Sequence, residues 1–171
     1  MSKTIDSLEV FYAHALAIET EAAERYSQLA DVMDAHNNRD VADLFRWLCS
    51  LESQHAGEIA RRSQTLQLPS IPAWEYRWQD AESPESVPHE DTHYRMTAYQ
   101  ALRMALAGEQ GAVRFFEHVA GTSPVAEVRS LAATYAAEEQ EHVGHVLAAL
   151  SRHLPPSDDW DEDLDPPVSV E

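Results

Sequence analysis

The stretch Glu138-Glu139-Gln140-Glu141-His142 has a counterpart earlier in the chain, Leu51-Glu52-Ser53-Gln54-His55. A glycine follows two residues after each histidine, at Gly57 and Gly144, and a β-branched residue follows two positions later. On an α-helix of 3.6 residues per turn, the acid and the histidine of a Glu-x-x-His pair lie on one face and can bind the same metal ion. One such pair is weak evidence, so the interpretation depends on the sequence around both.

Four segments show apolar residues at steps of three and four, the spacing of amphipathic helices. They cover residues 7–36, 39–66, 98–121 and 124–153. The expected start and stop signals are, in order, Asp6 with Glu9, Asn37-Asn38, Thr97 with Gln100, and Ser123-Pro124. Only five glycines in 171 residues also favour helix over sheet. The sequence therefore predicts an all-α fold in the form of a four-helix bundle.

Residues 68–96 interrupt the helical spacing with four prolines, which predicts a long crossover between the second and third helices. Within it, Trp74, Tyr76 and Trp78 are expected to cover the flank of the bundle or a subunit contact. Residues 155–171 are acidic and lack Lys and Arg, so we expect a disordered tail there. The bundle would then be one domain over residues 1–154.

The chain carries a formal net charge of −18 and a single cysteine, Cys49. The charge argues against nucleic acid as a partner, because phosphates would be repelled, and it is compatible with attracting cations. One cysteine excludes an internal disulfide framework and a four-cysteine metal site. The first ten residues do not resemble a signal peptide, and no apolar run approaches the length of a membrane span. We therefore expect a cytoplasmic protein with no membrane partner.

Each predicted helix has a glutamate near its middle, and these are Glu19, Glu52, Glu109 and Glu139. In an antiparallel bundle the midpoints meet at one level, so these acids would converge with His55 and His142 between the helices. Buried, unpaired carboxylates cost several kcal/mol each, and Lys and Arg are absent from these faces. Two divalent cations would balance the four negative charges. Mixed carboxylate and imidazole ligands suit iron or manganese.

These motifs resemble the ferritin-like diiron proteins, and specifically the rubrerythrins. The stretches 19–26 and 109–116 are similar to the family's E-x-x-A-x-x-x-Y motif, with Phe116 in place of the second tyrosine, and a Glu-x-x-His pair follows each of them. The resemblance covers about residues 6–153. Offsets of 90 residues from Glu19 to Glu109, and of 87 from Glu52 to Glu139, are what duplication of a helix pair would leave.

The resemblance implies a two-iron centre. Its implied ligands are Glu19, Glu52, His55, Glu109, Glu139 and His142. Glu52 and Glu139 would bridge two iron ions, cycling between Fe2+ and Fe3+, with manganese or zinc as possible substitutes. The implied activity is that of a non-haem diiron oxidoreductase reacting with hydrogen peroxide or dioxygen. A ferroxidase or iron-handling protein, and a diiron hydroxylase, are the alternatives.

Two further departures from the family pattern refine this expectation. Ala112 stands where peroxide-reducing members usually have a further glutamate, so we expect the ligand sets to stay unchanged on oxidation. The four-cysteine rubredoxin domain is lacking, since Cys49 is the single cysteine. Electrons would therefore come from a separate carrier, such as a rubredoxin, a ferredoxin or a flavoprotein. A homodimer is also expected.

Other side chains near the predicted site are expected to contact the ligands, pack in the core or lie at the surface. Four of them flank the ligands, where they could face solvent or hydrogen-bond to a ligand, and these are Glu58, Glu138, Glu141 and His145. Surface or helix-end positions are expected for His14, His36, His118 and His153. Tyr26 and Tyr135 fall on the ligand face, where core packing and a hydrogen bond to a ligand carboxylate are both open.

Overall fold

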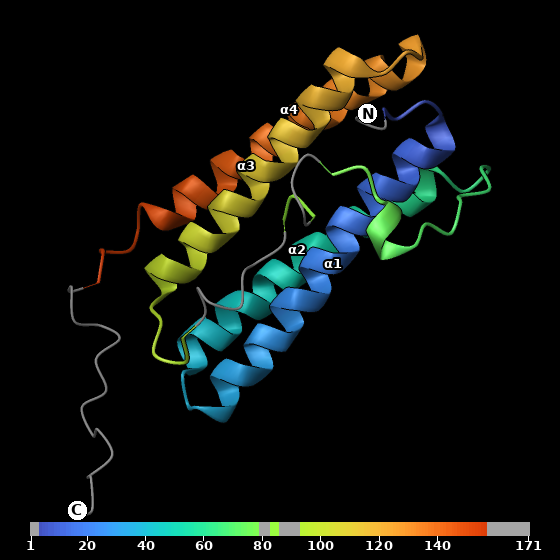
Figure 1. The fold of residues 1–171 in the computed structure, drawn as a ribbon. Helices are drawn as coiled ribbons and strands as arrows, with labels where there is room; N and C mark the ends of the chain where they lie inside the picture. The colour runs from blue at the N-terminus through green and yellow to red at the C-terminus, as the bar shows by residue number, and fades with distance from the viewer. Residues whose placement is uncertain (1–3, 79–82, 86–92, 157–171) are drawn as a thin grey trace, which may run out of the picture.

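The computed structural model describes residues 4–78, 83–85 and 93–156, and these form four long helices (Figure 1). The helices are α1 (Leu8–Ala35), α2 (Arg39–Arg62), α3 (Ala98–Thr122) and α4 (Ala126–Leu150), with a short 3-10 helix, η1 (Ala73–Glu75), in the crossover. No strand occurs in the described residues. The predicted all-α four-helix bundle with a long crossover is confirmed. The expected tail falls mainly on residues 157–171, which lie outside the described part of the chain.

The four helices form two hairpins, α1 with α2 and α3 with α4, which pack more extensively within themselves than against each other. Between the hairpins, α2 contacts α3 and α1 contacts α4. The crossover leaves α2 at one end of the bundle and the chain enters α3 at the other end, so α2 and α3 run in the same direction (Figure 1). None of the described helices is both long and apolar enough to cross a membrane.

The start of α1 differs from the prediction. Ser7, and not Asp6, is the N-cap, because its hydroxyl accepts a hydrogen bond from the Val10 N–H at 3.2 Å. The predicted pairing of Asp6 with Glu9 is therefore wrong, while the helix begins within two residues of the expected position. Serine and aspartate are both good caps, so two adjacent candidates cannot be separated from the sequence.

Asn37 and Asn38 separate α1 from α2 as predicted, but they do so by different means. Asn37 has a φ of 60°, the left-handed conformation that ends many helices. The side chain of Asn38 makes no cap hydrogen bond to α2. It donates instead to the carbonyl oxygens of Tyr94 and Met96, at 3.1 and 2.8 Å. The end of the crossover is thereby fastened to the turn between the first two helices.

At the remaining helix ends, one predicted cap is confirmed and three predicted boundaries are wrong. Thr97 and Gln100 form the predicted capping box of α3. The second helix ends at Arg62 and not near residue 66, and the fourth ends at Leu150 and not near 153. The fourth helix also begins two residues late, because Ser123 uses its hydroxyl to accept from the Val125 N–H and to donate to the Ile5 carbonyl.

Two apolar clusters fill the bundle on either side of its middle. One contains residues of α1 from Ala22 to Met33 with the first half of α2, and the other contains Phe11 to Ile18 with the second half of α3. The four predicted ligand glutamates fall in sequence between the parts that enter the two clusters. The polar layer therefore lies at the middle of the bundle, enclosed by hydrophobic core above and below.

The crossover is held to α1 by His14, which we expected at the surface. That prediction is wrong, because His14 is fully buried. Its Nε2 accepts a hydrogen bond from the Arg77 N–H at 2.8 Å, so Nδ1 carries the proton and donates to the Val10 carbonyl at 2.8 Å. Burial lowers the pKa of His14 to about 4, which keeps the ring neutral and able to accept.

Aromatic side chains of the crossover cover the bundle next to this contact. Tyr76 and Trp78 stack on each other with ring centroids 4.9 Å apart, and both meet the His14 ring edge-on. Trp78 also packs against Phe115 of α3. The expectation that they cover the flank therefore holds for Tyr76 and Trp78, whereas Trp74 is 84% exposed.

Further along the crossover, the backbone of Pro84 approaches α3 so closely that only glycine fits. A Cβ built at Gly111 would lie 2.3 Å from the Pro84 carbonyl oxygen, which is well inside contact distance. One helical turn earlier, a Cβ at Gly108 would meet Glu85 at 3.6 Å. These two glycines form a shallow track on α3 that receives residues 84 and 85.

Replacing Gly111 by alanine is expected to destabilise the metal-free protein by about 1–3 kcal/mol, the usual cost of overpacking. The new methyl group would push residues 84 and 85 away from α3. Gly144→Ala is the matched control, because a Cβ there meets nothing within 4 Å, and alanine improves helix propensity by up to about 1 kcal/mol. Denaturant unfolding measures both variants. A Gly111→Ala protein at least as stable as the wild type would contradict the close approach.

Candidate metal centre

The structure brings the six predicted ligand side chains together in two groups of three at the middle of the bundle. One group is Glu19, Glu52 and His55, and the other is Glu109, Glu139 and His142. In each group, one oxygen or nitrogen from every residue lies within 4.8 Å of the others, close enough to hold one ion. All four glutamates are buried and both histidines are partly exposed. Each group comes entirely from one hairpin.

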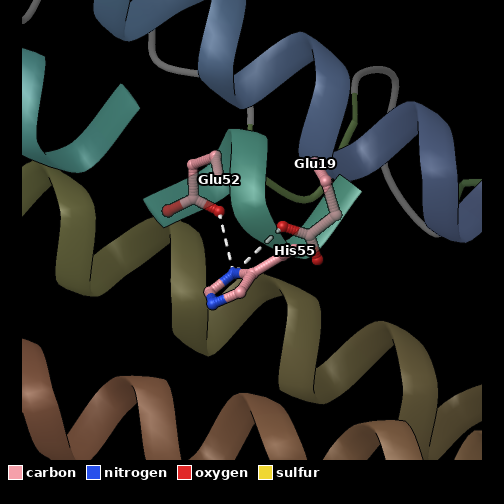
Figure 2. Close-up of side chains that lie close together, drawn as sticks. All are labelled: Glu19, Glu52 and His55. Carbon is pink, nitrogen blue, oxygen red and sulfur yellow. Dashed lines mark ion pairs between the residues drawn. The ribbon is translucent and has the colours of Figure 1, made fainter. Parts of the chain in front are cut away.

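Figure 2 shows the first group, in which the imidazole of His55 faces two carboxylates. Its Nδ1 lies 3.5 Å from an oxygen of Glu19 and 3.6 Å from an oxygen of Glu52. The glutamate of α1 and the Glu-x-x-His pair of α2 therefore direct their polar atoms at one point, as the helical spacing predicts.

The second group repeats this geometry on α3 and α4. The Nδ1 of His142 lies 3.6 Å from a Glu109 oxygen and 2.9 Å from a Glu139 oxygen, the latter a hydrogen bond. The rings of His55 and His142 stack with centroids 3.8 Å apart and planes inclined by 5°. The two groups are therefore adjacent and contain the same residue types, as duplication of a hairpin would produce.

Buried negative charge dominates the electrostatics of the site. Burial, together with the charges of Glu85, Glu139 and Glu52, raises the pKa of Glu19 well above its ordinary value. Burial also raises the pKa of Glu109 to about 7, against the opposing effect of His142. Without a cation, the site therefore holds protons that exposed carboxyl groups would have released.

His142 responds in the opposite sense to its burial. Desolvation lowers its pKa, but the neighbouring carboxylates of Glu109 and Glu139 outweigh this and raise it to about 10. In the metal-free protein the imidazole is thus protonated at neutral pH. It serves as the cation that the carboxylates otherwise lack.

The residues present fit a pair of metal ions. Among the described residues, one oxygen each of Glu19, Glu52 and Glu109, together with the Nδ1 of His55, is buried without a hydrogen-bond partner. Such atoms are costly unless a cation or donor compensates them. Neither Lys nor Arg belongs to either group, and four carboxylates with two imidazoles are a donor set for iron or manganese. Assignment of these six residues as ligands stays a prediction.

A further acid, which the sequence did not indicate, lies in the site. Glu85 of the crossover is 3% exposed and forms a third possible metal-binding group with Glu19 and Glu139. Nothing in the irregular sequence around it resembles a ligand motif. The one available signal is indirect, because Gly108 and Gly111 lie on one face of α3 and permit a close approach.

A cavity of about 300 Å³ lies beside the two histidines and connects the site with the surface. Three of the flanking acids line it, namely Glu58, Glu138 and Glu141. Arg62 binds Glu138 through both guanidinium nitrogens, at 2.9 and 3.1 Å, and covers the ring of Tyr135 at 5.3 Å. Glu138 is therefore engaged by a forked ion pair, which leaves Glu58 and Glu141 as the rim acids without an ion pair among the described residues.

The two ligand-face tyrosines are buried in different surroundings. Tyr135 packs among aromatic rings, with Phe11 and Phe116 each at a centroid distance of 5.4 Å. Tyr26 stacks on Phe45 at 5.9 Å, and burial with the nearby charge of Glu52 raises its pKa well above the ordinary value. Core packing is thus observed for both, and the described contacts include no hydrogen bond from either ring to a ligand carboxylate.

A four-helix bundle with a duplicated Glu and Glu-x-x-His set at its centre defines a protein of the ferritin-like diiron class. The family model described as rubrerythrin matches residues 11–96, and the chain belongs to this family. The crystal structure of an uncharacterized conserved protein from Magnetospirillum magnetotacticum MS-1 is 43% identical, with a TM-score of 0.66. The match covers 88% of this chain and 98% of that one. No curated protein matches the chain.

The stability of the metal-free protein is expected to fall as the pH rises from about 6.5 to about 9. The lower limit is set by His14, whose folded pKa is about 4, because above its ordinary value of 6.5 the ring is neutral in both the folded and the unfolded state and no longer affects the pH dependence. The raised pKa of Glu109 contributes its full stabilisation below pH 4.5, the ordinary pKa of the group. This contribution is lost as the pH rises through the folded-state pKa of about 7. The contribution of His142 is full below 6.5 and is lost as pH rises through about 10. Thermal unfolding should show a shallower pH slope for Glu109→Gln. A melting temperature that rises over this range would be inconsistent with these shifts.

Proposed function

We propose that this protein binds two iron ions and acts as an oxidoreductase of the rubrerythrin type, reacting with hydrogen peroxide or dioxygen. The observation that carries the proposal is the pair of equivalent Glu, Glu and His groups, joined through the stacked histidines. Glu19 with His55 would hold one ion, Glu109 with His142 the other, and Glu52 and Glu139 would be shared. Iron bound there would supply the one-electron redox chemistry.

The surroundings of the site support reaction with a small oxidant. The cavity beside His55 and His142 is large enough for peroxide or dioxygen, and its lining is mostly charged. A hydroxylase would need an apolar pocket for an organic substrate, and this cavity does not offer one. Apolar clusters enclose the ligand layer above and below, which leaves the cavity beside the histidines as the route of access within the described part of the chain.

Electrons would come from a separate donor protein, because Cys49 cannot by itself hold a four-cysteine iron centre. Rubredoxin, ferredoxin and flavoprotein are the donor classes we propose to test. Manganese or zinc would compete for the same oxygen and nitrogen ligands.

One observation favours a second candidate, an iron-oxidising protein that passes its product on. Glu58 and Glu141 lie at the rim of the cavity and could guide Fe2+ toward the histidines. Arg62 opposes this path, since it neutralises Glu138 at the same rim. We therefore place the oxidoreductase first and the ferroxidase second.

Anaerobic reconstitution with Fe2+ is expected to give two iron ions per chain, because two cations balance the four ligand carboxylates. Glu52→Ala and Glu139→Ala should each lower this number, since each removes a shared ligand. Glu117→Gln, at an exposed position of α3, is the control and should bind two. Metal analysis after desalting provides the measurement. One ion or none per wild-type chain would sink the proposal.

The oxidoreductase and the ferroxidase differ in what happens after the first turnover. Oxidation of the loaded protein by peroxide or dioxygen should stop at two Fe2+ per chain and resume only when a reductant is added. A ferroxidase would instead continue to consume added Fe2+, and Glu58→Gln with Glu141→Gln would slow it. Stopped-flow absorbance with counted Fe2+ equivalents separates the two, and continued consumption without reductant would favour the second candidate.

A further inference from the structure

The crossover contributes an acid that is buried as deeply as the predicted ligands. Glu85 is 3% exposed, and its Oε1 is enclosed without a hydrogen-bond partner among the described residues. A buried carboxyl group needs a hydrogen-bond acceptor when it is protonated, and a hydrogen-bond donor or a cation when it is ionised. The described residues provide neither for Oε1, so a group outside them must satisfy this oxygen.

The carboxylate of Glu85 is directed into the predicted metal centre. One of its oxygens lies within 4.8 Å of ligand atoms of both Glu19 and Glu139. These two acids belong to different hairpins, so Glu85 reaches the place where the two groups of ligands meet. It does not line the cavity beside the histidines, although Glu19 and Glu139 do. Glu85 therefore approaches the carboxylates from the side away from the cavity.

The surrounding structure is built to hold Glu85 in this position. Gly111 lacks the side chain that would collide with Pro84, and Gly108 leaves room for Glu85 itself. A Cβ added at any of the other three glycines, at positions 57, 121 and 144, would meet no described atom within 4 Å, so close approach at a glycine is confined to this track. On the other side, His14 fixes the crossover through Arg77.

We propose that Glu85 is a fifth carboxylate ligand of the two-metal centre, binding between Glu19 and Glu139. This inference rests on the proposed function, because it requires that metal binds at the six predicted ligands. It also changes the expectation based on Ala112. Helix α3 has Ala112 where an acidic ligand is usual in the family, but the crossover places another acid, Glu85, at the same centre.

An added carboxylate alters the charge balance in a defined direction. Four carboxylates match two divalent cations, whereas two trivalent cations exceed them by two charges. With Glu85 ionised there are five carboxylates. The net charge of the site is then +1 with two trivalent cations and −1 with two divalent cations. Glu85 thus favours the ferric state, so its removal is expected to raise the reduction potential of the centre.

The first test is a crystal structure of the wild-type protein loaded with Mn2+, with the ions located by anomalous scattering. We expect a Glu85 oxygen within about 2.0–2.6 Å of an ion, the range of carboxylate–metal bonds. Both Glu85 oxygens beyond about 3 Å from two bound ions would overturn the proposal. This test does not depend on whether any variant folds.

The second test compares Glu85→Gln with Glu117→Gln, which removes the same charge from an exposed position. Anaerobic titration with Mn2+ and Fe2+ should show at least about a tenfold loss of affinity for one ion in Glu85→Gln, and wild-type affinity in Glu117→Gln. A redox titration should give a higher potential for Glu85→Gln. A merely structural role would change the unfolding of the metal-free protein and leave affinity and potential unaltered.

The outcomes separate this proposal from the proposed function. A wild-type protein that binds no metal pair refutes the proposed function. A wild-type protein that binds two ions, with Glu85→Gln binding them equally tightly at the same potential, refutes the role of Glu85 alone. If Glu85→Gln does not fold, Glu85→Asp retains the charge and withdraws it by one methylene, and it should show the same loss of affinity.

Discussion

An ionised carboxylate removed from water costs several kcal/mol unless a positive charge or hydrogen-bond donors compensate it. In this bundle Glu19, Glu52, Glu109 and Glu139 are all buried at one level, between two apolar clusters that could have been continuous. Apolar residues at these positions would give a more stable core without any ligand. The arrangement is therefore best understood as one in which folding stability was exchanged for a binding site, with bound cations restoring it.

The position of the acids at the seam between the hairpins would give bound cations a structural role as well. Each hairpin packs mainly on itself, and each supplies one complete group of two carboxylates and a histidine. Backbones of the two hairpins approach each other less than those within a hairpin, and side chains join the two, among them the stacked rings of His55 and His142 and the rings of Phe11 and Tyr135. Ions bound by shared carboxylates would therefore add a further link between two hairpins that the apolar clusters already join, which couples metal binding to the assembly of the bundle.

Most of the fold, and the convergence of six side chains at the candidate site, could be predicted because local sequence encodes them. Helical periodicity fixes which face is buried, and Glu-x-x-His on such a face fixes which side chains meet. The exact caps could not be predicted where neighbouring residues compete, as at Asp6 and Ser7, or where tertiary contacts take over a side chain, as at Asn38. His14 was misplaced for a similar reason, since its partner Arg77 lies 63 residues away in sequence.

The crossover could not be interpreted from sequence, because it has no period and its placement depends on the shape of α3 at Gly108 and Gly111. Yet this segment adds a difference between the two halves of the site. Both halves carry alanine three residues after the first ligand, at Ala22 and Ala112, so the helices themselves offer equivalent ligand sets. Glu85 has no counterpart related by the duplication, and it lies near Glu19 of one half and Glu139 of the other. Glu85 therefore adds to the inequality of the two halves of the candidate site, beside differences within the duplicated helices such as Tyr26 in one half and Phe116 in the other.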